Sequence, residues 1–341
     1  MLDDLKLFHK RDKSDALGVA EKQWEQLGYK FEFEAKKSTE IKNIVFCGMG
    51  GSALAAIISR TWPGYDIPFE ISRDYSLPKY ANQSTLVIAS SYSGDTEETL
   101  SAYDQAKRND CQIAVISSGG SLAKKAGEDG NTSVLLPSGF QPRMATLYSL
   151  KAVVSLLVSL GLANESILKD LESAGEFIKT HSAKWVAQNP TNENRAKQLA
   201  QELMGKSPVI YGSELMFPAA YKWKISFNEN AKNVAWCNSF PEFNHNEFLG
   251  WSSHPVQKSY SVIFLKSTFD NPRVNKRFEI TEQLLSGQWP SPITIEAEGD
   301  TILKQILWLI VLGDFTSLYL AFLNGLDPTP VDLISKFKSL L

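Results

Sequence analysis

The sequence predicts an α/β protein built from two domains, each with a parallel sheet packed between layers of helices. Apolar, β-branched runs alternate along the chain with stretches of helical length and pattern, an order typical of βαβ units. The strand–turn–helix pattern of IVFCGMGGSALAAIISR also returns in VIYGSELMFPAAYKWK, which indicates a weak internal duplication. The length of 341 residues is enough for two domains with separate cores.

The elements follow in a regular order along the chain. In the first half we expect strands at 41–47, 84–89, 112–117 and 132–136, and helices at 52–60, 96–108, 143–161 and 164–188. In the second half we expect strands at 208–211, 259–265 and 292–296, and helices at 215–226, 272–285, 301–323 and 331–341. Asn189-Pro190 interrupts the pattern, so we place one domain at 1–189 and the other at 190–341.

Composition narrows the class of function. The formal net charge of -3 gives no basic surplus for a nucleic-acid partner. The N-terminus is charged and lacks an apolar signal core, and the apolar stretches at 152–162 and 305–323 are too short or too interrupted to predict a membrane helix. Three widely spaced cysteines fit a reducing cytoplasm, and four scattered histidines without a CxxC or HExxH motif disfavour a metal site. We therefore expect a cytoplasmic protein with no cofactor.

The first loop with a possible binding role is Gly48-Met49-Gly50-Gly51-Ser52, between a predicted strand and a predicted helix. Glycines let a backbone approach a ligand closely, and a helix N-terminus offers N–H groups and a positive dipole end to an anion. The same residues also fit a tight turn in which Ser52 caps the helix. The loop lacks the GxGxxG spacing of dinucleotide sites and the GK[ST] of a P-loop.

The second loop, SSYSGDTEET at 90–99, also opens a predicted helix. Ser91, Ser93 and Thr96 supply three hydroxyl groups around one helix N-terminus, which suits a small dianion held without Arg or Lys. A capping box would also place Ser or Thr three residues before Glu, but these hydroxyls exceed what capping needs. Both loops lie at the carboxyl ends of neighbouring strands, where open α/β sheets bind ligands, so we expect a phosphate site there.

The two loops, GMGGSALAA and SSYSGDTEETL, resemble the phosphosugar loops of the sugar isomerase (SIS) domain. The resemblance continues through PRMATLYSL, FNENAK, PEFNHNEFLGW and DPTPVDLISKFK, so it covers nearly the whole chain in order. The full set resembles the bifunctional phosphoglucose/phosphomannose isomerase family. This implies two SIS-like, doubly wound αβα sandwich domains of flavodoxin-like topology with the active site between them. By the same resemblance the substrate phosphate would be contacted by Gly51, Ser52, Ser91, Ser93 and Thr96.

The resemblance implies an aldose–ketose isomerase that interconverts glucose 6-phosphate and/or mannose 6-phosphate with fructose 6-phosphate. Glu229 would be the base, since burial can raise a carboxylate pKa, although a solvated helix-end glutamate also fits. His245, a type of residue that titrates near neutral pH, would open the sugar ring from a neighbouring subunit, which implies a homodimer. Arg143 would stabilise the enediolate. Lys338 aligns with the family's C-terminal lysine, with Lys336 as the alternative.

Two residues depart from the family pattern. Asp95 stands where Asn is expected and Phe337 where Leu is preferred.

Other functions stay open. The main alternative is a non-catalytic phosphosugar-binding SIS regulatory protein, which would keep the loops and lack the base. An amidotransferase-type SIS isomerase would normally carry a glutaminase domain with an N-terminal cysteine, whereas this chain starts MLDD. A nucleotide-dependent oxidoreductase lacks its loop spacing here.

Overall fold

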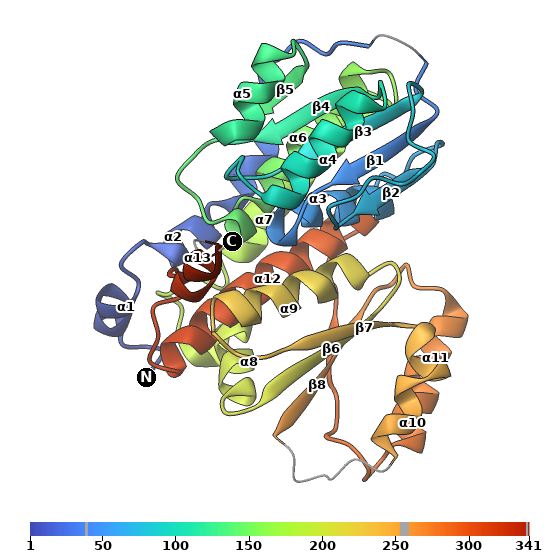
Figure 1. Ribbon diagram of the computed structural model, residues 1–341. Coiled ribbons are helices and arrows are strands. Elements are labelled where there is room, and N and C mark those ends of the chain that lie inside the picture. The colour runs from blue at the N-terminus through green and yellow to red at the C-terminus, as the bar shows by residue number, and fades with distance from the viewer. Residues whose placement is uncertain (38–39, 253–258, 339, 341) are drawn as a thin grey trace. The chain divides into compact units, whose positions relative to one another are not determined.

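The computed structural model describes residues 1–37, 40–252, 259–338 and 340. The chain forms two compact units, which we call the first unit, Gln23–Glu176, and the second unit, Met1–Lys22 together with Phe177–Leu341. Within the described residues each unit contains one sheet, and the paired strands of both sheets run parallel (Figure 1). The sheet-and-helix class predicted from the sequence is therefore confirmed, with helices on both faces of each sheet as described below.

The elements of the first unit follow the predicted βαβ order. They are η1 (Gln23–Gly28), β1 (Asn43–Cys47), α3 (Gly50–Thr61), β2 (Phe69–Ser72), β3 (Thr85–Ser90), α4 (Glu97–Arg108), β4 (Gln112–Ser117), α5 (Gly120–Glu128), β5 (Thr132–Leu135), η2 (Pro142–Met144) and α6 (Thr146–Ser159). Helix α7 (Ser166–Ser182) begins in the first unit and ends in the second. The strand order is β2-β1-β3-β4-β5, so the chain moves to one side of β1 and then returns to the other.

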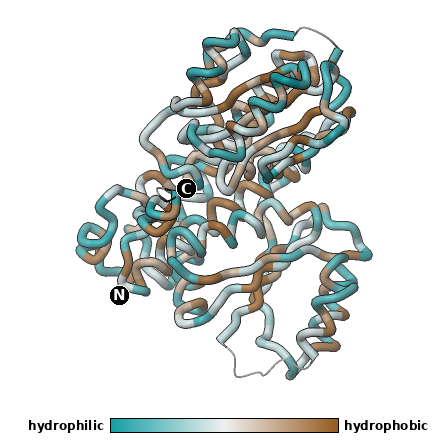
Figure 2. The backbone as a smooth tube through the Cα atoms, viewed as in Figure 1, coloured by the Kyte–Doolittle hydropathy of each residue, from teal (hydrophilic) through white to brown (hydrophobic). Residues whose placement is uncertain are grey.

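The three central strands of the first sheet, β1, β3 and β4, are buried on both faces, since successive side chains point to opposite faces and helices cover each face. Val45 pairs with Val87 in neighbouring strands, and both pack on α4 and α5 in one apolar cluster with Tyr103 and Leu122. On the other face α3 and α6 pack against each other and contact β1 and β4 (Figure 1). Figure 2 shows apolar residues concentrated in these strands. Near-continuous burial of strands is what a parallel sheet between two helix layers requires.

The second unit repeats the arrangement with four strands in the order β7-β6-β8-β9. Its elements are α1 (Leu5–Arg11), α2 (Ala16–Glu21), η3 (Thr191–Glu193), α8 (Arg195–Leu203), β6 (Ser207–Ser213), α9 (Phe217–Glu229), β7 (Trp236–Phe240), η4 (Glu242–His245), α10 (Glu247–Trp251), β8 (Tyr260–Lys266), α11 (Pro272–Leu284), β9 (Ile293–Glu296), α12 (Ile302–Leu323) and α13 (Asp332–Lys338). Helices α8, α9 and α12 pack together (Figure 1). The other face carries an aromatic cluster that includes Phe240, Phe243, Phe264 and Phe278.

Helix α12 is the central helix of the second unit. Its most apolar 18-residue window has a mean hydropathy of 2.0, long and apolar enough to cross a membrane, and 94% of that window is buried inside the protein. A helix that is apolar all round is typical of a protein core as well as of a membrane. Gly313 lets Trp223 of α9 lie close, since a Cβ there would be 2.3 Å from the indole Nε1. The burial therefore identifies α12 as a core helix.

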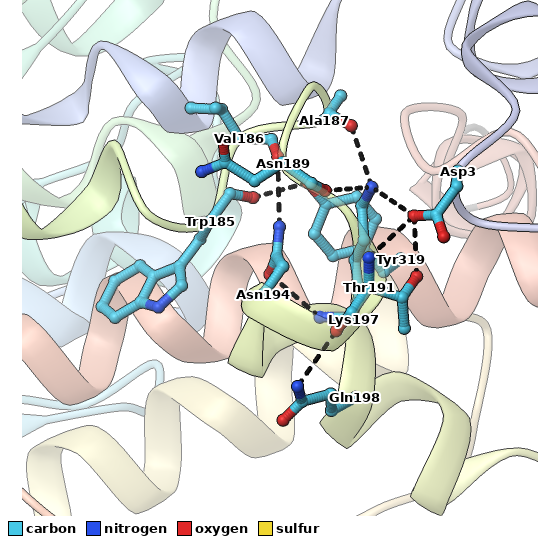
Figure 3. A network of polar contacts seen from close by, with 10 residues as sticks. All are labelled: Asp3, Trp185, Val186, Ala187, Asn189, Thr191, Asn194, Lys197, Gln198 and Tyr319. Atoms are coloured by element: carbon cyan, nitrogen blue, oxygen red, sulfur yellow. Dashed lines mark hydrogen bonds and ion pairs between the residues drawn. The ribbon is translucent and has the colours of Figure 1, made fainter.

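A buried lysine ties the N-terminal segment to the second unit (Figure 3). The side chain of Lys197 is fully buried, and its Nζ donates to the carbonyls of Ala187 at 2.8 Å and Asn189 at 2.7 Å and to the Asp3 carboxylate at 3.2 Å. Asp3 also accepts from the N–H and hydroxyl of Thr191, both at 2.8 Å, and these bonds lower its pKa. Burying a charge is costly unless it is paired in this way. The network ties Asp3 to the second unit, and α1 and α2 also pack on α12, so the first 22 residues belong to this unit.

Several expected features differ from the structure. The expected limits at 1–189 and 190–341 follow a break in the pattern, whereas the contacts divide the chain within α7 and assign the N-terminal residues to the second unit. The strands β2 and β7 were not expected, and neither were the helices α1, α2, α5, α8 and α10. Both strands lie at sheet edges and are only partly buried, so they lack a continuous apolar run. Within the expected helix 331–341, positions 339 and 341 lie outside the described residues.

Candidate functional site

The two predicted phosphate loops lie at the point where the strand order of the first sheet reverses. The chain leaves β1 toward β2 on one side and returns to β3 on the other side. Residues 48–52 follow β1 and open α3, and residues 91–96 follow β3 and open α4. Open α/β sheets bind ligands outside the carboxyl ends of the strands at such a switch point.

Glycines bring the first loop close to its neighbours. A Cβ on Gly48 would lie 2.9 Å from the carbonyl oxygen of Ser90, at the end of β3. A Cβ on Gly51 would lie 3.0 Å from the backbone nitrogen of Arg143. Helix α3 begins at Gly50, and the first N–H groups of a helix have no partner within it. The loop thus presents helix-end amides in a place where its backbone also meets the 142–143 segment.

The second loop gathers its hydroxyl groups at the start of α4. The Oγ of Ser91 lies 2.8 Å from Oγ1 of Thr96 and 3.5 Å from Oγ of Ser93. It also accepts from the N–H of Gly94 at 3.1 Å. Ser91 is buried, Ser93 is exposed and Thr96 is half-buried, so the group runs from the interior to the surface. Hydroxyls can rotate to donate, which makes this group suitable for an anion at a helix N-terminus.

Tyr92 joins the two loops, a role that was not predicted for it from the sequence. Its N–H donates to Oγ of Ser52 at 3.1 Å, across from the first loop. Its hydroxyl donates to the carbonyl of Pro137 at 2.8 Å and accepts from the N–H of Phe140 at 2.9 Å. Tyr92 therefore connects both phosphate loops with the segment that leads to Arg143. Its position among the Ser residues of the second loop was the one available signal.

The Asp95 carboxylate is hydrogen-bonded within the protein and does not simply face the predicted phosphate site. Its Oδ1 accepts from the N–H of Ser121 at 2.9 Å, at the start of α5, and the hydrogen bonds from Ser121 lower the pKa of Asp95. Negative side chains are favourable at a helix N-terminus. The acidic residue that departs from the family pattern thus caps a neighbouring helix.

The second loop also packs tightly against the start of α5. Gly94 and Gly119 lie so close that a Cβ on Gly94 would be 1.9 Å from the carbonyl oxygen of Gly119.

Arg143 is buried in the first unit, with 1% of its surface exposed. It lies in the short helix η2, and its Nη1 donates to Oε1 of Gln141 at 3.3 Å. Its carbonyl accepts from the hydroxyl of Thr146 at 3.0 Å. A buried cation is costly and needs compensating negative or polar groups. The structure therefore places Arg143 beside Gly51 of the first predicted phosphate loop.

Glu229 is the last residue of α9 and is half-buried. It lines a cavity of about 460 Å³ together with Asn228, Lys232, Asn233, Val234, Val331, Asp332, Leu333 and Ile334. The first turn of α13 thus shares this cavity with the end of α9. A buried polar network holds α9 to α12: Lys222 and Ser226 bond to the Asp314 carboxylate, and Asn230 donates to Oγ of Ser317 at 2.9 Å. Two contact points along α9 fix the helix that carries Glu229.

His245 and Lys338 are both exposed in the second unit. His245 ends the short helix η4, which is anchored by the buried ring of Phe243 and by the Asn244 amide, whose Nδ2 donates to Oγ1 of Thr281 at 2.9 Å. Lys338 is the last residue of α13. These positions leave the roles of both residues as predictions. Among the residues that the structure describes, no cluster of three or more His, Cys, Asp or Glu could hold a metal ion.

The second unit has its own switch point between β6 and β8, but the chain's own carboxylate occupies it. Asp270 is buried and accepts from the hydroxyl of Ser213 and from the N–H of Ser267 at 2.8 Å. Burial raises the pKa of this carboxyl. The Ser213 hydroxyl and the Ser267 N–H, which are comparable to the hydroxyl and amide groups in the loops of the first unit, therefore already have Asp270 as their acceptor. This difference favours the loops of the first unit as the anion site.

The fold and these paired loops define a protein of the SIS class. A crystal structure described as a glucose-6-phosphate isomerase like protein from Thermus thermophilus has the same fold, with a TM-score of 0.68 and 17% identity over 100% of this chain and 99% of the other. Residues 192–341 match the family model described as the bacterial phospho-glucose isomerase C-terminal SIS domain.

Two relatives define the family more narrowly. A bifunctional phosphoglucose/phosphomannose isomerase from Caldicellulosiruptor bescii is 39% identical over 89% of this chain and 91% of the relative. Another, from Aquifex aeolicus, is 34% identical over 90% of this chain and 93% of the relative. The chain belongs to the bifunctional phosphoglucose/phosphomannose isomerase family.

Proposed function

We propose that this protein is an aldose–ketose isomerase that interconverts glucose 6-phosphate and/or mannose 6-phosphate with fructose 6-phosphate in the cytoplasm. The observation that carries the proposal is the group of hydroxyls and helix-end amides at the switch point of the first sheet. Ser91, Ser93 and Thr96 lie together there, and Ser52 is linked to the same loop through Tyr92. This is a site for a phosphate dianion. The names of the relatives supply the sugar and the reaction.

The proposed reaction moves one carbon-bound proton between C2 and C1 and needs no oxidant or metal. His245, with Lys338, would transfer a proton to the ring oxygen as its bond to C1 breaks and the C1 hydroxyl gives up its proton, so that the sugar opens to the aldehyde. Glu229 would then remove the proton from C2 of the aldose, and a cis-enediolate forms with its negative charge on the C1 oxygen. Return of the proton to C1, while the C2 hydroxyl proton passes to the C1 oxygen, gives the ketose. Arg143 would stabilise the negative charge that develops on the enediolate oxygens. Rotation about C2–C3 would let one base serve both C2 epimers.

Fructose 6-phosphate formation from each hexose phosphate, measured in a coupled assay with and without EDTA, tests the activity. We expect turnover of at least one hexose phosphate and no loss with EDTA. Binding without turnover would instead support the regulatory protein. Activity abolished by chelation would contradict the metal-free reaction.

Glu229→Gln tests the base. We expect kcat to fall by about 10²–10⁴, the usual contribution of a general base, while substrate affinity stays within about threefold. The matched control is Glu202→Gln, which removes an exposed carboxylate paired with Arg195 on α8 and should leave kcat unchanged. A variant with wild-type kcat at position 229 would rule out Glu229 as the base.

We further propose a homodimer in which His245 acts in the neighbouring subunit's site. The support is that His245 is exposed at the end of an anchored short helix, where a second copy can approach it. Refolding equal amounts of the inactive Glu229→Gln and His245→Ala chains together should give mixed dimers as half of all dimers. Each mixed dimer has one intact site out of two, so the mixture should recover about a quarter of wild-type activity. If His245 acts within its own chain, the mixture stays inactive.

A further inference from the structure

Lys232 follows α9 in an unusual backbone conformation. Its φ is 50°, in the left-handed region that non-glycine residues adopt only at a cost. Three residues earlier, Glu229 ends the helix. The left-handed residue turns the chain away from α9, and the N–H of Asn233 bonds back to the carbonyl of Phe227 at 3.1 Å. The free-energy cost of this backbone conformation is offset by the hydrogen bonds of the Lys232 side chain.

The Lys232 ammonium connects two distant parts of the chain. Its Nζ donates to the carbonyls of Asp327 and Pro328, both at 2.9 Å, and to that of Asn230 at 3.3 Å. An ammonium group has three protons, so three carbonyls match its donors. One acceptor belongs to the end of α9 and the other two lie 95 and 96 residues further along the chain. Lys232 therefore fastens the 327–328 turn to the end of the helix that carries Glu229.

The turn that Lys232 holds leads directly into α13. Asp327 stiffens it by accepting from the N–H of Thr329 at 2.9 Å, and two prolines restrict its backbone. Helix α13 has no buried side chain, and Leu333 and Phe337 are 82% and 62% exposed. Burial in the second unit therefore does little to fix this helix. Its first turn nevertheless lines the same cavity as Glu229 and Lys232.

We propose that Lys232 is a positioning residue that holds α13, and with it Lys338, beside the cavity lined by Glu229. The proposal rests on the proposed function, because it matters for catalysis only if Glu229 is the base and α13 brings a group to it. The role is distinct from that of a catalytic residue, since Lys232 acts through the carbonyls of the turn. Without the Lys232 ammonium, the 327–328 turn that leads into α13 loses the hydrogen bonds from this side chain at the end of α9.

Two variants separate the side chain from the backbone. Lys232→Met keeps an unbranched apolar side chain and removes the ammonium. Lys232→Gly removes the side chain and at the same time relieves the left-handed backbone, so it should not destabilise the fold by strain. The matched control is Asp110→Gly, another exposed left-handed residue with φ of 53°, in a turn of the first unit.

The test measures hydrogen exchange of residues 329–338 in the full chain, together with kcat and KM for glucose 6-phosphate and mannose 6-phosphate. We expect both Lys232 variants to speed exchange in this segment and to lower kcat, each by about tenfold, with KM within about threefold. The Asp110→Gly control should match the wild type in both measurements. A destabilised fold would instead speed exchange throughout the second unit.

Unchanged exchange at 329–338 in both Lys232 variants would overturn the proposal. Faster exchange with unchanged kcat would overturn its catalytic part. If the wild-type protein turns over neither hexose phosphate, the proposed function fails, and the exchange measurement still decides whether Lys232 holds α13.

Discussion

Replacing Ser52 by Ala tests how the two phosphate loops depend on each other. Ser52 is 9% exposed, and its Oγ accepts from the N–H of Tyr92 at 3.1 Å. Without the hydroxyl, that buried N–H loses this acceptor, which costs about 1–3 kcal/mol in the free energy of unfolding. At about 2–4 °C per kcal/mol, a loss of about 2 kcal/mol lowers the melting temperature of the first unit by about 4–8 °C.

The same hydroxyl is expected to bond to the substrate phosphate. A hydrogen bond to a charged group contributes about 1.5–3 kcal/mol, which corresponds to about a 10–150-fold loss of affinity. Calorimetric titration with fructose 6-phosphate measures that loss, and thermal unfolding measures the stability.

The matched control is Ser59→Ala in the same helix. Ser59 is fully buried and bonds to the hydroxyl of Tyr65, which lies outside both loops. It should lose stability and keep its affinity for fructose 6-phosphate. Wild-type affinity in Ser52→Ala would refute the reasoning, because it would show that neither the hydroxyl nor the loop link contributes to phosphate binding.

Two further changes examine the second loop. Gly94→Ala should destabilise the protein by at least about 2 kcal/mol in urea unfolding, since its Cβ would lie 1.9 Å from the Gly119 carbonyl and its φ is +82°. The control Gly139→Ala, at a position with φ of +93° and open space around the new Cβ, should lose only about 1 kcal/mol. Equal losses in the two variants would contradict the steric argument. The Asp95 pKa is lowered in the fold by its bonds from Ser121, so its stabilisation is present above the unfolded pKa near 3.8 and is lost as the pH falls through the lower folded pKa. Asp95→Asn should therefore flatten the acid side of the stability profile, measured by thermal unfolding from neutral to acidic pH, and an unchanged profile would show that Asp95 contributes nothing to it.

Much of the fold could be predicted from local patterns in the sequence. The central strands β1, β3 and β4 were predicted within about two residues, because strands buried on both faces are continuous apolar runs. The edge strands β2 and β7 were missed because their half-exposed residues, such as Trp236, give no such run. The glycine and hydroxyl residues of the loops were also visible, since they follow buried strands directly.

The sequence by itself determined the parallel α/β architecture, the two loops and the family, because these depend on periodicity and on residues that are neighbours along the chain. Only the tertiary structure decided that Asp95 caps α5, that Arg143 is buried beside Gly51, and that Lys197 binds the N-terminal segment to the second unit. The physical reason is that these outcomes depend on which distant backbone groups a side chain reaches. A carboxylate or an ammonium looks the same in the sequence whether it faces water or satisfies a buried partner.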